Sequence, residues 1–425
     1  MGAPKILSIS PLFYSQHGSY TSQLAQQGVI DLTNFIVSSE ETFQIRFANA
    51  DRMQGPFHLD DAVSVRPLPL PFEKPAGVRE YRNRDYLSSH PEIWGEDPKV
   101  IVMSQQCRLN ADIKALFRDP PRIILYSEFF VPSDIAARKE WPLRESMRVS
   151  MELWREKSLT DGLHADAIVV PTQFAKKLWP DKFQDKIHVI FDGVDTEHLS
   201  MQRIGRLSGY GAGFRESVPG KRLVAYIGRT IESIRGFDAW VKVYIRLREA
   251  RPDLHFIVLG EDKIIQRGGG SEYYYGVASF KTYVLEGMGL KEEDLSDITW
   301  IPRLKFYDYL SLLSVLDIAL YPMYGMFANW SLFQALQMGV PVVASDRAYL
   351  PEVFLTGENG YLADPDNVDS FVGCALKILD DPVTAASLRR NAQQTITDRY
   401  SVGVSSRRFA SLLDALGMPV TIPPP

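Results

Sequence analysis

Short apolar runs rich in valine and isoleucine alternate along the chain with longer segments of helical periodicity. This alternation is typical of strands that pair in parallel and are covered on both faces by crossover helices, so we predict an α/β fold. The expected strands of the first half are residues 5–10, 43–49, 100–105, 122–128, 167–172 and 187–193, and those of the second half are 222–229, 255–261, 297–303, 318–323 and 341–346. Two series of strands predict two doubly wound, Rossmann-like sheets, with ligand chemistry at the carboxyl ends of their strands, facing a cleft between them.

The two series are separated by residues 196–221, where glycines and polar residues replace the apolar periodicity. We place a domain boundary there, between an amino-terminal domain of residues 1–200 and a carboxy-terminal domain of residues 201–404. Residues 405–425 are expected to form a helix and tail that pack back toward the amino-terminal domain. Residues 50–97, rich in proline, histidine and aromatic residues, form a long excursion, either a surface insertion or a loop that shapes a substrate.

Composition narrows the function classes. The 425 residues are 45% hydrophobic and 23% charged, as in soluble globular proteins. The formal net charge of −5 provides no overall positive field for a nucleic-acid backbone. The two cysteines, Cys107 and Cys374, lie far apart and outside any metal-ligand spacing, so neither a disulfide framework nor a metal site is expected. Neither a secretory signal nor a membrane-spanning run is apparent, which favours a cytoplasmic protein.

Two arginines follow the first strand of the second series. The strand is expected to end at Gly228, Arg229 follows directly, and Arg235 stands just before an amphipathic helix. Guanidinium groups at such a point are suited to a diphosphate, which they can hold bidentately and whose growing charge they can stabilise. The alternative is that both arginines are solvated or pair with the nearby Glu232 and Asp238.

A helix start provides a second candidate anion site. Asn329 is placed to cap a helix from Trp330 to about Met338, with Gly339 as its stop. The free amides and the positive dipole end of a helix amino terminus bind anions. A nucleotide diphosphate therefore fits between this helix and the two arginines.

Five segments of the second half form one pattern: Gly-Arg at 228–229, Arg-Gly-Phe at 235–237, the helix and strand of 331–346, and the segments PEV and GENGYLAD that follow. This pattern resembles the retaining family 4 glycosyltransferases, which have the GT-B architecture of two facing Rossmann-like domains. Residues 126–134 and 159–199 are similar to the amino-terminal domain of one bacterial branch of that family. The resemblance implies transfer of a sugar from a nucleotide-diphosphate sugar to an acceptor hydroxyl with retained anomeric configuration, without a metal in the chemical step and without a cofactor.

The resemblance also implies roles for the matching residues of the second domain. Its donor-binding positions are Gly228, Arg229, Arg235, Arg303, Met326, Asn329, Trp330, Ser331, Leu332 and Gln334. Arg229 and Arg235 match the basic pair that holds the diphosphate, and the amides of residues 329–332 match the backbone that meets the phosphates and the sugar. Met326 and Gln334 occupy the positions of the family's two glutamates, which meet the donor sugar and the nucleoside ribose.

Neither of those two positions holds a carboxylate, which leaves two interpretations open. Gln334 can still hydrogen-bond ribose hydroxyls, and the branch that the first domain resembles often lacks the first glutamate. The protein is then an active glycosyltransferase, expected in surface polysaccharide or glycoconjugate synthesis, or a catalytically silent homologue that binds a nucleotide sugar or glycan and supports a partner enzyme. Epimerisation and phosphorolysis by the same fold are not favoured, because the residues and the lysine-bound cofactor that they use find no place in the sequence.

The first domain supplies the candidates for the acceptor side. Glu128 follows a strand between aromatic residues, and we expect it to orient the acceptor or the donor sugar, or else to cap a neighbouring backbone. Gly18 stands at a helix start with His17 before it, where a ligand can lie against backbone amides, and Thr172 ends another strand. The sequence does not specify whether the acceptor is a glycan, a lipid-linked or a small molecule. The mixed charges of residues 138–152 favour a solvated helix face over contact with the inner membrane surface.

Overall fold

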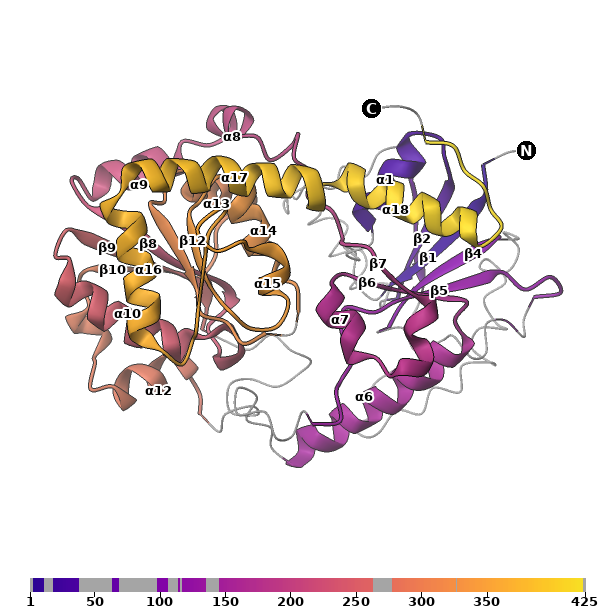
Figure 1. Cartoon of the computed structure of the whole chain (residues 1–425), viewed down its shortest axis with the longest axis horizontal. Coiled ribbons are helices and arrows are strands. Elements are labelled where there is room, and N and C mark those ends of the chain that lie inside the picture. Colours follow the sequence, from indigo (N-terminus) through magenta and orange to yellow (C-terminus); the bar gives the residue numbers. More distant parts are fainter. Residues whose placement is uncertain are drawn as a thin grey trace. The chain divides into compact units, whose positions relative to one another are not determined.

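The computed structural model describes residues 3–10, 18–37, 63–68, 98–105, 114, 117–134, 145–262, 277–325 and 327–422. They belong to two compact units (Figure 1). The first unit comprises Met1–Pro132, Ser150–Gly193 and Tyr400–Pro425, and the second comprises Ser133–Val149 and Val194–Arg399. The chain therefore leaves the first unit after Gly193 and returns to it at Tyr400, a few residues before each of the boundaries that the sequence suggests.

The first unit contains a parallel sheet whose described strands run in the order β3-β2-β1-β4-β5-β6-β7. Its strands are β1 Lys5–Ser10, β2 Asp31–Val37, β3 Val63–Leu68, β4 Val100–Ser104, β5 Arg122–Tyr126, β6 Ala167–Val170 and β7 Ile187–Val189. Its helices are α1 Gly18–Gln26, α6 Glu145–His164, which belongs to this unit from Ser150 onward, α7 Gln173–Leu178, the 3-10 helix η3 Asp181–Lys186 and α18 Val402–Ala415.

Both faces of this sheet are covered, which explains why residues 100–103 of the central strand β4 are apolar on both faces. In β4, Val100 and Val102 pack toward α1 and α18, whereas Ile101 and Met103 pack on the opposite face toward α7. Successive side chains of a strand point to opposite faces, so a strand that is buried on both sides has no polar face.

The carboxy-terminal helix α18 belongs to this unit. The rings of Tyr20 in α1 and Phe409 in α18 lie 5.0 Å apart, and Ser406 Oγ donates a hydrogen bond to Gln23 Oε1 at 2.6 Å. Figure 1 shows α18, in yellow, beside α1 in the same unit. The helix thus completes the apolar layer on one face of the first sheet.

The second unit repeats the arrangement with a parallel sheet of order β10-β9-β8-β11-β12-β13. Its strands are β8 Arg222–Thr230, β9 Leu254–Glu261, β10 Ile298–Ile301, β11 Ile318–Tyr321, β12 Val342–Ser345 and β13 Tyr361–Ala363. Its helices are α8 Met201–Leu207, α9 Tyr210–Ser217, η4 Ser233–Arg235, α10 Phe237–Ala250, α12 Phe280–Gly287, η5 Glu292–Asp294, α13 Phe306–Ser314, α14 Trp330–Gln337, α15 Leu350–Val353, α16 Val368–Asp380 and α17 Pro382–Tyr400.

Aromatic packing fixes α10 against the second sheet. The ring of Trp240 stacks on that of Tyr244 at 5.6 Å and meets the edge of Phe256 from β9 at 6.2 Å. All three side chains are fully buried, and burial of a large apolar side chain contributes about 1.5–3 kcal/mol. These contacts anchor α10, which begins two residues after Arg235, on the second sheet.

The strand order places a topological switch point in each sheet. Strand order reverses between β1 and β4 in the first sheet and between β8 and β11 in the second. In open α/β sheets, ligands bind outside the carboxyl ends of the strands at such a point. The segments after β8 and β11 are therefore where a ligand of the second unit is expected.

The sequence-based assignment is largely confirmed, with two departures. The expected strand 43–49 lies outside the described residues, whereas β2, β3 and β13 were not expected, and β3 falls within the excursion of residues 50–97. The boundary segment 196–221 contains two helices, α8 and α9, which its loss of apolar periodicity did not indicate. Gly211 obscured the helical pattern: it lies so close to Ser311 of α13 that a Cβ would overlap the Ser311 carbonyl, and its amide donates to Ser311 Oγ at 2.9 Å.

Candidate functional site

The carboxyl end of β8 carries the first candidate residues. The strand continues through Thr230, past its expected end at Gly228, with an irregular register against β9 between Ile227 and Thr230. Gly228 and Thr230 are buried, whereas Arg229 between them is exposed. Arg229 therefore presents its charge at the surface of the switch point.

Arg235 is the last residue of η4 and is paired within the loop. Its Nε donates to Glu232 Oε1 at 2.8 Å, and Thr230 Oγ1 donates to the same oxygen at 2.7 Å. The side chain of Glu232 is 5% exposed and that of Arg235 is 25% exposed. Arg235 is therefore paired with Glu232, one of the two carboxylates that the sequence suggested as its partners. The pairing engages Nε and orients the guanidinium.

The loop after β8 packs tightly on the loop after β11. Gly236 has a φ of 71°, and a Cβ at this position would overlap the Pro322 carbonyl. Tyr324 N donates to Ile234 O at 3.1 Å, and the Arg235 side chain crosses Gly228, where a Cβ would lie 3.2 Å from Arg235 Cδ. These contacts bring the arginine loop beside the segment that leads to α14.

The first turn of α14 has the cap that the sequence predicts. Asn329 Oδ1 accepts hydrogen bonds from Ser331 N at 3.1 Å and from Ser331 Oγ at 2.8 Å, and the helix ends before Gly339, whose φ is 71°. The Asn329 amide donates to Tyr349 Oη at 2.8 Å, and the Leu332 amide donates to the Asn329 carbonyl at 3.0 Å. The Ser331 amide is thus already bonded to the Asn329 side chain. A phosphate could accept a hydrogen bond from this amide only by displacing that side chain.

The hydroxyls of a buried and a half-buried tyrosine meet at the carbonyl of Ser331, a feature that the sequence analysis missed. Tyr321, the last residue of β11, donates to Ser331 O at 3.1 Å, and Tyr309 of α13 lies 3.5 Å from the same oxygen. Burial raises the pKa of Tyr321. The Tyr321 hydroxyl thus anchors the first turn of α14 to the end of β11.

The other donor-side candidates are less closely grouped. Gln334 lies half-buried one turn further along α14. Arg303 is exposed in the loop after β10, and β10 is separated from β8 by β9. Met326 lies outside the described residues. The structure thus brings together Gly228, Arg235 and the turn at Asn329, with Arg229 at the same edge of the sheet, and it leaves Arg303 apart.

In the first unit, Thr172 has a structural role. It caps α7, with Oγ1 accepting from Ala175 N at 3.0 Å, and it is buried, so its hydroxyl oxygen already serves the helix. Gly18 begins α1 as expected. His17 lies outside the described residues.

Glu128 follows β5 and is half-buried. It lies near Tyr126, whose hydroxyl donates to Asp192. Burial raises the pKa of Tyr126, and the negative charges of Asp192 and Glu128 add to the effect. Two carboxylates therefore lie close to one buried tyrosine. Sequence reasoning missed this grouping because Asp192, which follows β7, is 66 residues away from Tyr126 in the sequence.

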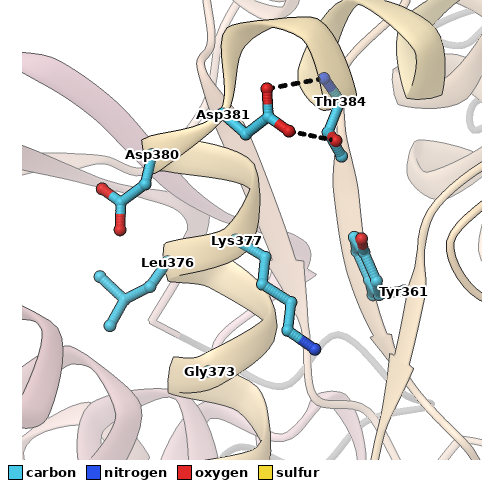
Figure 2. A pocket seen from close by; sticks show the side chains of 7 residues that line it. All are labelled: Tyr361, Gly373, Leu376, Lys377, Asp380, Asp381 and Thr384. Atoms are coloured by element: carbon cyan, nitrogen blue, oxygen red, sulfur yellow. Dashed lines mark hydrogen bonds between the residues drawn. The ribbon is translucent and has the colours of Figure 1, made fainter.

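A surface pocket of about 510 Å³ lies elsewhere in the second unit (Figure 2). It is lined by Tyr361, Gly373, Leu376, Lys377, Asp380, Asp381 and Thr384. Figure 2 shows the Asp381 carboxylate turned toward Thr384, where it accepts from the amide at 3.2 Å and from Oγ1 at 2.6 Å and so caps α17. Asp380 is paired with Arg251, and Lys377 lies over the ring of Tyr361. The charged groups of this pocket are thus engaged in holding α16 and α17.

None of the helices in the described part of the chain combines the length and the apolar composition that crossing a bilayer takes. Within the same residues, no group of three or more histidine, cysteine, aspartate or glutamate side chains is arranged as metal ligands.

Comparison with known proteins identifies relatives of both units. The family model described as "Glycosyl transferase family 4 group" matches residues 98–199, and the one described as "Glycosyl transferases group 1" matches residues 221–381. The 2-deoxystreptamine N-acetyl-D-glucosaminyltransferase of Niallia circulans is 26% identical over 182 residues, which are 43% of this chain and 42% of that protein. A GDP-mannose-dependent monoacylated alpha-(1-6)-phosphatidylinositol monomannoside mannosyltransferase of Corynebacterium glutamicum is 20% identical over 210 residues, 48% of this chain and 49% of that protein.

Each match to these curated relatives spans less than half of the relative's length. Among solved structures, HepE of Anabaena in complex with UDP superposes with a TM-score of 0.68 at 13% identity, covering 97% of this chain and 100% of that one. That likeness shows a shared fold, GT-B. Because the two family models together match more than half of the 425 residues, the chain belongs to the family 4 glycosyltransferases.

Proposed function

We propose that this protein transfers a sugar from a nucleotide-diphosphate sugar to an acceptor hydroxyl with retention of anomeric configuration. The observation that carries the proposal is the convergence of Arg235 and the first turn of α14 at the switch point between β8 and β11. A cationic side chain and a helix amino terminus at one strand edge suit a diphosphate, whose negative charge grows as it leaves. The names of the relatives add support, since one uses GDP-mannose and a structural neighbour binds UDP.

In the proposed reaction, the bond between the anomeric carbon and the diphosphate oxygen breaks on the same face on which the acceptor oxygen attacks. The acceptor hydroxyl gives its proton to the departing diphosphate, so the products are the glycoside and the nucleoside diphosphate. Arg229 and Arg235 would stabilise the leaving diphosphate, Arg235 through its Nη groups while Glu232 holds Nε. The turn at residues 329–332 would bind the phosphates and the sugar.

The remaining candidate residues complete the proposal. Gln334 would hydrogen-bond the ribose through its side-chain amide, and Arg303 would contribute to base binding. Glu128 would orient the acceptor or the donor sugar, with Gly18 at the start of α1 on the acceptor side. From the branch resemblance, we further propose a cytoplasmic role in surface polysaccharide or glycoconjugate synthesis.

The proposal is tested by binding and turnover. UDP, GDP and their sugars are each added to the purified protein, because a ligand that binds only the native state raises the melting temperature. We expect stabilisation by one nucleotide family, and loss of it in Arg229→Ala and Arg235→Ala. Arg246→Ala, which removes an exposed arginine of α10 paired with Asp369, is the matched control. Absence of any response in the wild-type protein would contradict the proposed donor site.

The second candidate is a catalytically silent homologue that binds a nucleotide sugar. The uncharged Gln334, at the position of the family's second glutamate, is the observation that favours it. Hydrolysis or transfer of the stabilising nucleotide sugar is compared between the wild type and Gln334→Glu. A large gain in the variant indicates a silent site that the glutamate restores, whereas active wild type with a weaker variant indicates that glutamine is the adapted residue.

A further inference from the structure

The hydroxyl groups of three tyrosines from different parts of the second unit contact the first turn of α14. Tyr321 comes from β11, Tyr309 from α13 and Tyr349 from the segment before α15. The first two point their hydroxyls at the Ser331 carbonyl, and Tyr349 Oη accepts the Asn329 amide. The three hydroxyl contacts at this turn therefore arise from the tertiary structure and not from the sequence of α14 itself.

Each contact sets the orientation of a peptide plane in that turn. A peptide unit is planar, so an anchored carbonyl of Ser331 also determines where the amide of Leu332 points. The amide of Asn329 is fixed in the same way by Tyr349. The Asn329 amide is thereby engaged by Tyr349, and the Leu332 amide by the Asn329 carbonyl. What these contacts preserve is the shape of the turn that the proposed function assigns to the phosphates.

Tyr321 makes the shorter of the two tyrosine contacts to the Ser331 carbonyl. Its hydroxyl is 3.1 Å from Ser331 O, within ordinary hydrogen-bond range, whereas Tyr309 lies at the long limit of 3.5 Å. The side chain of Tyr321 is 2% exposed and comes from a central strand of the sheet, so it is a rigid support.

We propose that Tyr321 is a positioning residue that holds the first turn of α14 in the geometry that binds the donor diphosphate. The inference rests on the proposed function, since it assigns a support to the same site. The hydroxyl acts through the Ser331 peptide and does not itself touch the ligand. Its contribution is a preformed turn, which spares the ligand the entropic cost of ordering that turn on binding.

The test separates phosphate binding from general stability. Tyr321→Phe removes the hydroxyl and keeps the ring. The control is Tyr244→Phe in α10, which removes a tyrosine hydroxyl that donates to Asp297 Oδ1 at 2.9 Å. Dissociation constants of UDP, UMP, GDP and GMP are measured by calorimetry for both variants and the wild type. A lost hydrogen bond of ordinary strength predicts a rise of about threefold to tenfold in the diphosphate constant for Tyr321→Phe.

The rise should be confined to the diphosphates, so that the advantage of UDP over UMP, or of GDP over GMP, shrinks in Tyr321→Phe and is unchanged in Tyr244→Phe. An equal loss for mono- and diphosphates, or the same loss in both variants, would overturn the positioning role while leaving the proposed function in place. Failure of the wild-type protein to bind any of the four would overturn both. If Tyr321→Phe does not fold, Tyr309→Phe is measured instead, with a smaller rise of the same kind expected and no rise counting against the inference.

Discussion

Arg235 donates a hydrogen bond from Nε to Glu232 Oε1 across 2.8 Å, and the carboxylate that accepts it is more deeply buried than the guanidinium that donates. Removal of the arginine therefore leaves a buried charge with Thr230 as its remaining described donor. We predict that Arg235→Ala lowers the free energy of unfolding by about 1–3 kcal/mol, the cost of a buried acceptor that loses its partner. Urea denaturation of the variant and the wild type measures this loss.

A second substitution distinguishes the lost charge pair from a general effect of truncation. In Arg235→Ala/Glu232→Gln the buried group is neutral, so part of the lost stability should return. If the double variant is less stable than Arg235→Ala, the pair is not what Arg235 contributes to the fold. Diphosphate binding can be compared between the same two variants. Recovery of binding in the double variant gives the part of the Arg235→Ala defect that comes from the disturbed loop.

The cap of α14 allows stability and anion binding to be separated. Asn329→Asp keeps an oxygen that accepts from Ser331 N, and aspartate is as good a cap as asparagine. It also adds a negative charge where a phosphate is proposed to bind. We predict unchanged or slightly increased unfolding free energy together with a rise of about tenfold or more in the dissociation constant of the stabilising nucleotide diphosphate, since charge at a helix terminus is worth up to about 2 kcal/mol.

Asn329→Ala is the companion variant, because it removes the cap without adding charge. It should lose about 0.5–2 kcal/mol of stability. Its diphosphate affinity should not fall as far as that of Asn329→Asp. Equal affinities of the two variants would argue against an anion at this turn.

The parts of the site that follow local rules could be predicted from the sequence. Three predicted features are found: the Asn329 cap, the stop at Gly339 and the position of Arg235 before α10. Each of them depends only on residues within about one turn of its own position. For Arg235 the sequence left open whether the guanidinium binds a diphosphate or is solvated or paired with Glu232 or Asp238. Burial of Glu232, which decides the pairing, depends on how the loop packs against the segment after β11.

The tyrosine support could not be predicted, because it depends on tertiary structure. Tyr309, Tyr321 and Tyr349 are separated by up to 40 positions in sequence and belong to different elements. Each also fits an ordinary apolar pattern, so nothing in the sequence distinguishes a tyrosine that anchors a carbonyl from one that fills the core. The helix α9 was missed because Gly211 interrupts its apolar pattern, and that glycine is required by close packing on Ser311 of α13.

The contact between the loops after β8 and β11 predicts a large effect at Gly236. Alanine there would have to adopt a φ near 71° and would overlap the Pro322 carbonyl. Gly220 has nearly the same φ, 73°, but a Cβ there meets nothing within 4 Å, so it controls for the backbone conformation alone. We predict a loss of about 1 kcal/mol for Gly220→Ala, and of about 3 kcal/mol or more for Gly236→Ala, in chemical denaturation. Similar losses in the two variants would mean that the loop moves aside at little cost.

Asp166 predicts a pH dependence of stability in the first unit. Partial burial acts to raise its pKa, but hydrogen bonds from Lys114 Nζ at 2.8 Å and the Ile123 amide at 2.7 Å, with the charges of Lys114 and Arg122, hold that pKa below its usual value. A carboxyl whose pKa is lower in the folded state stabilises the protein above its unfolded pKa of about 3.9, and this contribution disappears as the pH falls through the folded value. Asp166→Asn should therefore be less stable than the wild type at neutral pH.

The difference between Asp166→Asn and the wild type should shrink as the solution is acidified below about pH 4, because protonation removes the same charge from the wild-type protein. Urea midpoints at a series of pH values give this difference directly. Asp119→Asn, which removes an exposed aspartate of the same unit, controls for the change in net charge and should alter stability by less than about 0.5 kcal/mol. A difference for Asp166→Asn that stays constant from neutral to acid pH would show that the shape of the aspartate, and not its charge, is what the site at Ile123 and Lys114 requires.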